Sequence, residues 1–279
     1  MEILITGANG QLGTELRHLL DERNVAYTAA GSKELDITDV TAVNEFFAAN
    51  APKIVYHCAA YTDVDAAEEE PGKTLDEKVN VDGTINIAKA AESVGATLVY
   101  ISTDYVFDGT KSDLYSVDDT PNPRNEYGRT KYEGELAVQK YVSKYYIIRT
   151  SWVFGEYGKN FVYTMLNLAK THDHLTVVND QIGRPTWTRT LAEFMTHVVD
   201  KHAYYGVYQL SNDDSCSWYE FAKEILKDTN VEIAPVTSEE YPQKAYRPRH
   251  SIMDLSKAKA TGFEIISWQE ALEKFKEKI

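Results

Sequence analysis

The sequence has few cysteines and no long apolar run. Its 279 residues contain only Cys58 and Cys216, which lie far apart and lack the spacing of metal ligands. We therefore expect no disulfide framework, no metal site and a reducing compartment. No apolar run approaches the ~20 residues that cross a bilayer, and the opening segment is broken by Gly7 too early for a signal peptide. These absences predict a cytoplasmic protein without a membrane partner.

Positive charge is also scarce. The formal net charge is −14, and no basic block or stripe occurs, so a nucleic-acid partner is not expected. The apolar fraction of 43% is typical of a folded soluble protein,. A chain of this length can form one large domain or two smaller ones.

The start of the chain predicts a strand, a glycine-rich turn and a helix. Residues 2–6 predict a buried strand, and leucines recur at helical spacing from Leu12 to Leu20,. Between them lie Gly7, Gly10 and Gly13, spaced G-x-x-G-x-x-G. Glycines allow a sharp turn and close approach of a ligand, and the helix N-terminus offers N–H groups to a pyrophosphate. The spacing differs from G-x-G-x-x-G, and a tight structural turn is the alternative, but the strand–turn–helix context favours a dinucleotide site.

Strands and helices alternate over the first 150 residues. We expect strands at 27–30, 54–60, 98–102 and 145–149, and helices after Thr38, at 75–94 and from Tyr127. Such βα units predict an α/β protein with a doubly wound parallel sheet. Beyond Trp152 the pattern loosens, with helices expected at 160–170, 190–199, from Ser217 and at 268–278, and strands at 175–179 and 206–210. We therefore divide the chain into a dinucleotide-binding domain, 1–150, and a smaller substrate domain, 151–279, that exchanges segments with the first.

Tyr127 and Lys131 lie four residues apart, so they share one face of the expected helix,. An ammonium beside a phenol stabilises the phenolate, and we expect Lys131 to lower the pKa of Tyr127. Such a phenol can exchange a proton with a carbonyl or alcohol near neutral pH. By itself the pair also fits an exposed helix face.

Ligands of open parallel sheets bind at the carboxyl ends of the strands. Ser102 and Thr103 end one expected strand, and a hydroxyl there can hold a carbonyl oxygen together with the Tyr127 phenol. The two residues compete for this role. Strand alternation favours Thr103, and capping of the strand end is its alternative role.

With these motifs, the chain resembles the dTDP-4-dehydrorhamnose reductases, a family in the extended branch of the short-chain dehydrogenases/reductases. The resemblance extends over residues 1 to about 255 and includes the segments 102–109, 149–155, 160–166, 179–186 and 245–248. It implies a Rossmann fold and NAD(P)H-dependent reduction of the C4 keto group of dTDP-4-dehydro-β-L-rhamnose. The product, dTDP-β-L-rhamnose, is an activated sugar for surface polysaccharide.

The resemblance also implies roles for individual residues. Tyr127 would protonate the keto oxygen, Lys131 would lower the pKa of Tyr127 and bond the nicotinamide ribose, and Thr103 would polarise the carbonyl. Asn80 would support Lys131 through water. With Tyr127 and Lys131, the cofactor would be bound by Gly7, Gly10, Gln11, Leu12, Gly13, Asp36, Ile37, Ala60, Tyr61 and Thr62. The nucleotide-sugar would contact Thr103, Asp104 and Trp152.

The preference for a cofactor depends on the end of the second strand. A site for NAD usually has an acid about 20 residues beyond the glycines. No acid lies at the tip here, and Ser32 and Lys33 can accept a 2′-phosphate. We expect NADPH, with NADH tolerated, although Lys33 also fits a solvated turn. For the substrate's pyrophosphate the candidates are Arg184 and Arg247, because guanidinium pairs with phosphate through two hydrogen bonds. A solvated surface role is the alternative for both.

Three other functions compete with the reductase. A nucleotide-sugar dehydratase of this fold needs an Asp-Glu pair after the threonine, but Asp104 is followed by Tyr105. An epimerase is a second relative of the same fold. A noncatalytic NADP-binding regulatory subunit would be favoured by loss of Thr103, Tyr127 or Lys131, and all three are present. The oligomeric state, monomer or homodimer, stays open.

Overall fold

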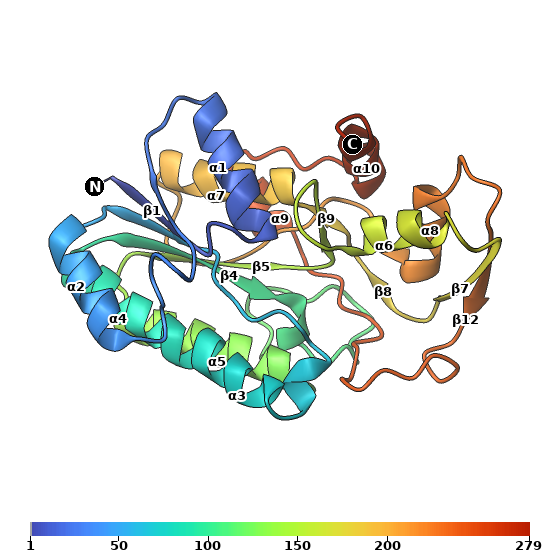
Figure 1. Ribbon diagram of the computed structural model, residues 1–279, viewed down its shortest axis with the longest axis horizontal. Coiled ribbons are helices and arrows are strands. Elements are labelled where there is room, and N and C mark those ends of the chain that lie inside the picture. Colours follow the sequence, from blue (N-terminus) through green and yellow to red (C-terminus); the bar gives the residue numbers. More distant parts are fainter. Residues whose placement is uncertain (1) are drawn as a thin grey trace.

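The computed structural model describes residues 2–279, and a six-stranded parallel sheet lies at its centre (Figure 1). The strands are β1 (Ile3–Thr6), β2 (Thr28–Ala30), β3 (Ile54–His57), β4 (Thr97–Thr103), β5 (Tyr145–Thr150) and β10 (Gly206–Gln209). Their order is β10-β5-β4-β3-β1-β2, and each neighbouring pair is parallel. The predicted α/β class with a parallel sheet is confirmed.

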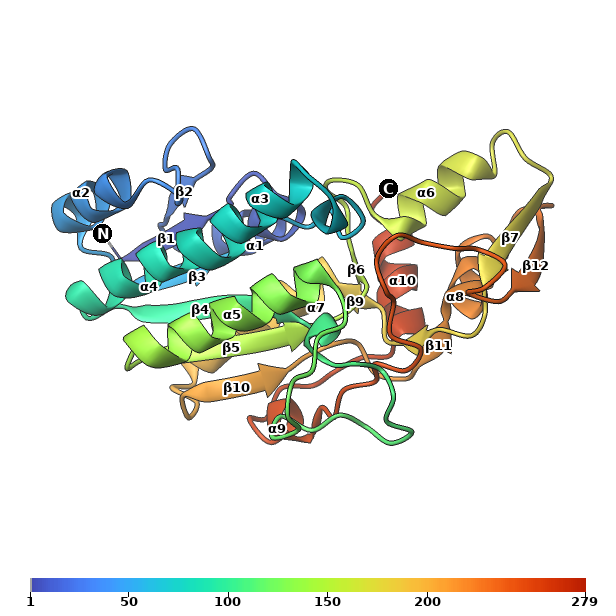
Figure 2. The ribbon, with the colours of Figure 1, turned by 90° about the horizontal axis from the view of Figure 1, so that it is seen from below.

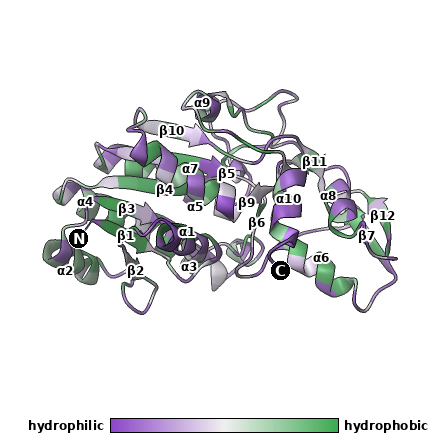
Figure 3. Cartoon of the chain, turned by 90° about the horizontal axis from the view of Figure 1, so that it is seen from above, coloured by the Kyte–Doolittle hydropathy of each residue, from purple (hydrophilic) through white to green (hydrophobic). Residues whose placement is uncertain are grey.

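Helices cover both faces of this sheet, as Figures 1 and 2 show. On one face lie α1 (Gln11–Glu22) and α7 (Thr188–Asp200). On the other lie α2 (Val40–Asn50), α3 (Gly72–Asp76), a π-helical stretch (Glu77–Gly83), α4 (Thr84–Ser93) and α5 (Glu126–Tyr141). Because apolar side chains pack against the sheet from both sides, its strands are buried on both faces,. Figure 3 shows the central strands largely in the hydrophobic colour.

The chain changes direction within the sheet. After β1 it adds β2 on one side, and it then returns to place β3 on the other side of β1. At such a switch point the connections leave the carboxyl ends of the two strands in opposite directions, which opens a crevice for ligands. The fold therefore places a binding site at the carboxyl ends of β1 and β3.

The C-terminal half has a core of its own, which includes Phe154, Phe221 and Phe275. It contains β6 (Val153–Phe154), α6 (Phe161–Leu168), β7 (His174–Val178), β8 (Ile182–Gly183), β9 (Thr186–Trp187), β11 (Cys216–Ser217), α8 (Trp218–Ile225), β12 (Glu232–Val236), α9 (Ser256–Lys259) and α10 (Trp268–Lys276). Two of its segments nevertheless join the first half, since β10 pairs with β5 and α7 packs in one core with α1. The division of the chain at residue 150 stays a prediction.

Local details differ from the sequence-based expectation in three places. The cap of α2 is Asp39 and not Thr38, because the Asp39 carboxylate accepts from the N–H groups of Thr41 and Ala42 at 2.9 and 3.1 Å,. Strand β3 ends at His57, three residues early. The long helix after residue 70 forms, but a π-helical stretch interrupts it. Over residues 2–279, no helix is both long enough and apolar enough to cross a membrane.

Candidate active site

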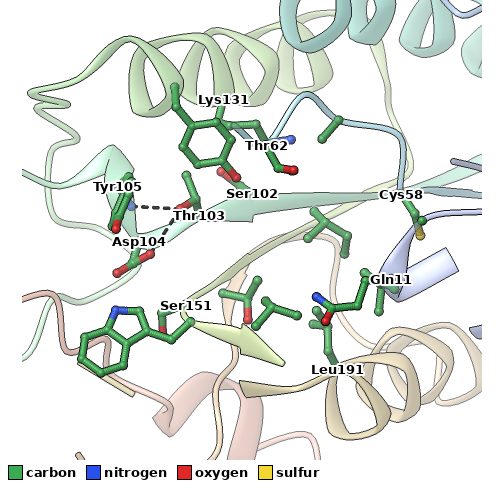
Figure 4. Close-up of a pocket in the computed structure, with 18 of the residues that line it drawn as sticks. Gln11, Cys58, Thr62, Ser102, Thr103, Asp104, Tyr105, Lys131, Ser151 and Leu191 are labelled. Atoms are coloured by element: carbon green, nitrogen blue, oxygen red, sulfur yellow. Dashed lines mark hydrogen bonds between the residues drawn. The ribbon is translucent and has the colours of Figure 1, made fainter. Parts of the chain in front are cut away.

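A cavity of about 630 Å³ opens at the carboxyl ends of β1, β3, β4 and β5 (Figure 4). Of the candidate residues named from the sequence, eleven line it: Gly10, Gln11, Leu12, Ala60, Thr62, Ser102, Thr103, Asp104, Tyr127, Lys131 and Trp152. They come from segments separated by up to 142 positions, from Gly10 to Trp152. The parallel sheet brings them together because the carboxyl ends of its strands meet at one edge.

The end of β4 turns into a short 3₁₀ helix, Asp104–Val106, and this turn holds three polar side chains at the cavity. The Thr103 hydroxyl accepts from the Tyr105 N–H at 3.1 Å and donates to Asp104 Oδ1 at 3.2 Å. Figure 4 shows Thr103 and Asp104 side by side at this turn. Burial raises the pKa of Asp104 to about 7, although hydrogen bonds from Ser251 and Thr103 oppose that shift,. The site therefore contains a carboxyl group poised to titrate near neutral pH.

Helix α5 carries Tyr127 and Lys131 on the face toward β4. Asn125 caps the helix by accepting from the Gly128 N–H at 2.7 Å,. A Cβ on Gly128 would lie 2.2 Å from the Tyr105 carbonyl oxygen, so only glycine lets the first turn approach the end of β4 this closely,. This contact places the Tyr127 ring against Tyr105, with centroids 6.1 Å apart and the planes nearly perpendicular.

Burial changes the protonation of this pair. Lys131 is 2% exposed, and its Nζ lies 4.2 Å from the centre of the Tyr100 ring. Burial lowers the pKa of Lys131 to about 7. Burial, followed by the charge of Asp104, raises the pKa of Tyr127. The expectation that Lys131 lowers the pKa of Tyr127 is wrong for this structure, because both groups are desolvated.

The cavity offers donors that fit a dinucleotide. Gly10, the N-cap of α1, provides no side-chain cap, so N–H groups of the first helical turn are open to an anion,. Two buried hydroxyls of the lining, Ser102 Oγ and Thr150 Oγ1, have no partner among the described residues. Lys159 also lines the cavity, and its neighbour Gly158 lies against Gln11. Polar atoms left unpaired in a protein interior are costly unless a ligand satisfies them.

Five predicted cofactor residues are not among those that line the cavity: Gly7, Gly13, Asp36, Ile37 and Tyr61. Gly7 has φ +64°, and a Cβ on Gly13 would lie 2.3 Å from the Gly7 carbonyl oxygen, so both glycines allow the tight turn. The Asp36 carboxylate accepts from the N–H and hydroxyl of Thr38, and the Ile37 side chain is part of the core. The expectation that no acid lies at the tip of the second strand is wrong, because the Glu34 carboxylate accepts from the N–H of Gly31, directly after β2, at 2.9 Å.

Asn80 holds the backbone of Tyr61, which lies between the lining residues Ala60 and Thr62. Its amide accepts from the Tyr61 N–H at 2.9 Å and donates to the Tyr61 carbonyl at 3.1 Å. The same amide donates to Asp76 at 2.6 Å, and Thr130 donates to Asp76 at 2.9 Å. The network joins the backbone before the π-helical stretch to the turn of α5 that holds Lys131.

The two candidate arginines differ in position. Arg184 lines neither the main cavity nor its neighbour, and its guanidinium donates to the Met253 carbonyl at 3.0 Å. Arg247 lines the neighbouring cavity of about 400 Å³, which shares Tyr105 and Trp218 with the main one. Arg247 donates to Asp65 at 3.0 Å, and its Nη1 is buried without a partner among the described residues. Each arginine has one buried N–H without a partner among the described residues, Arg184 Nε and Arg247 Nη1, and of the two only Arg247 lines one of these cavities.

Some residues of the lining were not singled out from the sequence. They include His57, Cys58, Lys159, Leu191 and Trp218. Thr150, which also lines the cavity, ends β5 as Thr103 ends β4, so its position at a strand end was a usable signal. No pattern in the sequence pointed to Trp218, because this residue reaches the cavity by stacking on Trp152, with ring centroids 3.6 Å apart. Trp152 has φ +48°, and such a conformation in a bulky residue requires a supporting structure.

Comparisons with known proteins agree with this arrangement. The family model described as RmlD substrate binding domain matches residues 1–279. The spore coat polysaccharide biosynthesis protein SpsK of Bacillus subtilis is 40% identical, over 98% of this chain and 96% of its own. A dTDP-4-dehydrorhamnose reductase of Streptomyces griseus is 41% identical, over 96% and 91%. The crystal structure of dTDP-4-dehydrorhamnose reductase from Bacillus anthracis in complex with NADP is 42% identical and covers both chains fully, with a TM-score of 0.96.

Proposed function

The chain belongs to the RmlD substrate binding domain family, and from this premise we propose that it reduces dTDP-4-dehydro-β-L-rhamnose to dTDP-β-L-rhamnose with NADPH. Relatives about 40% identical along nearly their whole length are dTDP-4-dehydrorhamnose reductases, which supports the resemblance seen in the sequence. The observation that carries the proposal is the meeting of Thr103, Tyr127 and Lys131 at one end of a cavity that reaches the glycine turn.

The cofactor supplies a hydride to the C4 carbon when it is bound. Gly10, Gln11 and Leu12 at the N-terminus of α1 would hold its pyrophosphate,. Lys131 would hold its ribose next to Tyr127. The unpaired Ser102 and Thr150 hydroxyls give this region further donors and acceptors.

The protein's own residues manage the developing charge on the substrate oxygen. Tyr127 donates its phenolic proton to that oxygen, and its pKa, raised by burial, keeps the proton in place until the alkoxide forms,. Thr103 donates a second hydrogen bond to the same oxygen. Donors held in place before reaction in a buried site are a large source of rate enhancement.

The residue after Asp104 favours reduction over dehydration. Tyr105 lies where a dehydratase of this fold has an acid, and its ring packs on Tyr127. Burial raises the pKa of Tyr105, so the phenol stays neutral and cannot replace a carboxylate base. The neighbouring cavity with Arg247 would take the nucleotide diphosphate part of the substrate.

The test follows nicotinamide absorbance with freshly generated dTDP-4-dehydrorhamnose and either NADPH or NADH. We expect oxidation of both, faster with NADPH. Tyr127→Phe should lower kcat by about 10²–10⁴-fold, the range for loss of a positioned proton donor, and leave NADPH affinity unchanged. Tyr132→Phe, on the same helix but outside the cavity lining, is the matched control and should keep full activity.

Failure of the wild-type protein to oxidise either cofactor, despite tight NADPH binding, would refute the reductase and favour the regulatory subunit. Conversion of the substrate to an isomer without cofactor oxidation would instead indicate an epimerase. We also propose a cytoplasmic location and a monomeric or homodimeric state. Cell fractionation and light scattering of the purified protein test these two proposals.

A further inference from the structure

We propose that Ser251 is a positioning residue for this reduction, since it holds Asp104 and thereby directs the Thr103 hydroxyl toward the substrate. The inference rests on the proposed function and deepens it. Ser251 lies 147 positions after Asp104 and is absent from the lining of the cavity. It therefore acts through Asp104 and not on the substrate.

The contacts form a short chain. The Ser251 hydroxyl donates to Asp104 Oδ2 at 2.5 Å, and the Thr103 hydroxyl donates to Asp104 Oδ1 at 3.2 Å. Ser251 and Asp104 are each 2% exposed. The Ser251 N–H also donates to the Ile182 carbonyl at 3.1 Å, which fixes the serine backbone. Each oxygen of Asp104 thus has a different hydroxyl partner in a site that solvent hardly reaches.

The direction of the Thr103 hydrogen depends on the protonation of Asp104. An ionised carboxylate only accepts hydrogen bonds, so it draws the one hydroxyl hydrogen of Thr103 away from the substrate. When Asp104 carries a proton on Oδ1, it donates to Thr103 Oγ1. The threonine then accepts from Asp104 and from the Tyr105 N–H, and its own hydrogen is free for the substrate oxygen.

Ser251 decides which oxygen of Asp104 carries that proton. In the arrangement that the structure shows, Ser251 donates to Oδ2, so a proton on neutral Asp104 lies on Oδ1 beside Thr103,. The titratable groups that interact with Asp104 are Tyr105 on its own turn and Tyr127 on α5. His250, next to Ser251, is influenced by Asp113 instead. The reactive arrangement is therefore neutral Asp104 with Ser251 on its outer oxygen.

The test measures kcat and KM against pH for the wild type and for Ser251→Ala. We expect a fall in kcat of about 10-fold, the effect of one hydrogen bond to an ionisable group, with NADPH affinity unchanged. Loss of the serine donor raises the pKa of Asp104, so the decline of kcat above neutral pH should move to higher pH. Asp104→Asn mimics the neutral acid and should make this part of the profile flat. Ser211→Ala is the matched control, because Ser211 is fully buried and its hydroxyl has no partner among the described residues.

Ser251→Cys, which keeps the size of the side chain but donates weakly, replaces Ser251→Ala if that variant does not fold. A Ser251 variant with wild-type kcat and an unmoved pH profile would overturn the inference, as would a loss of thermal stability alone. These outcomes require an active wild type, so they differ from failure of the proposed reductase itself.

Discussion

Gly134→Ala tests how α5 is held against β4. A Cβ on Gly134 would lie 2.2 Å from the Tyr100 hydroxyl oxygen, 2.9 Å from its Cζ and 3.0 Å from the Asn80 carbonyl oxygen. Tyr100 cannot yield easily, because it is fully buried and donates to the Lys131 carbonyl at 3.2 Å. The substitution therefore pushes directly on the ring beneath the Lys131 ammonium.

Two effects of opposite sign determine how much Gly134→Ala changes the free energy of unfolding. Alanine in a helix interior is favoured over glycine by about 0.8–1.0 kcal/mol. Overpacking a tight core usually costs about 1–3 kcal/mol, and three contacts at or below 3.0 Å, one of them to a backbone atom, place this site at the upper end. We expect a net loss of about 1–2 kcal/mol in the free energy of unfolding. Displacement of Lys131 should also lower kcat by about 10-fold, since sub-ångström misplacement affects the reacting geometry.

Urea denaturation measures the loss of stability, and steady-state kinetics measures the fall in kcat. Tyr100→Phe removes the nearest of the three atoms, so Gly134→Ala should cost less stability in a Tyr100→Phe background than in the wild type. Stabilisation of the protein by Gly134→Ala, in line with helix propensity alone, would refute the reasoning.

Three further predictions concern charge. Glu135→Ala should cost about 3–5 kcal/mol of unfolding free energy, because Arg149, 3% exposed and bonded to it at 2.7 and 2.9 Å, is left unpaired,. Glu133→Ala, which breaks a half-exposed pair on the same helix, should cost less than about 0.5 kcal/mol,, and equal losses in urea denaturation would contradict this. Asp104 has a pKa of about 7 against an ordinary 3.8, so the native state keeps a proton that the unfolded state has lost, and stability should fall as pH rises from about 4 to 7,. In Asp104→Asn the free energy of unfolding should no longer fall over this pH range. A fall that persists in this variant would show that another group causes it. Lys33→Ala should raise the KM for NADPH about 5-fold, since an exposed ion pair contributes up to about 1 kcal/mol, and leave the KM for NADH unchanged. A parallel change for both cofactors would remove Lys33 from 2′-phosphate recognition.

Local sequence patterns predicted where the side chains of Thr103, Tyr127 and Lys131 lie on their strand and helix. The 3.6-residue period placed Tyr127 and Lys131 on one helical face, and the strand that ends at Thr103 placed its hydroxyl at the sheet edge. Both statements depend on residues within a few positions of each other, where helix and strand geometry leave little choice. The position of Asp39 as the cap of α2 was missed by one residue, because Thr38 and Asp39 are both good caps and only the backbone turn selects between them,.

The sequence by itself determined the class of fold, the family and the residue types available for hydride chemistry, because strand and helix periods and short motifs are local properties. Tertiary structure alone decided which groups are desolvated, and so reversed the expected direction of the Tyr127 pKa. It also brought Ser251 to Asp104 and turned Arg247 toward a cavity while Arg184 bonds the Met253 carbonyl. Such contacts join segments up to about 150 residues apart, and their geometry follows from how the whole chain packs.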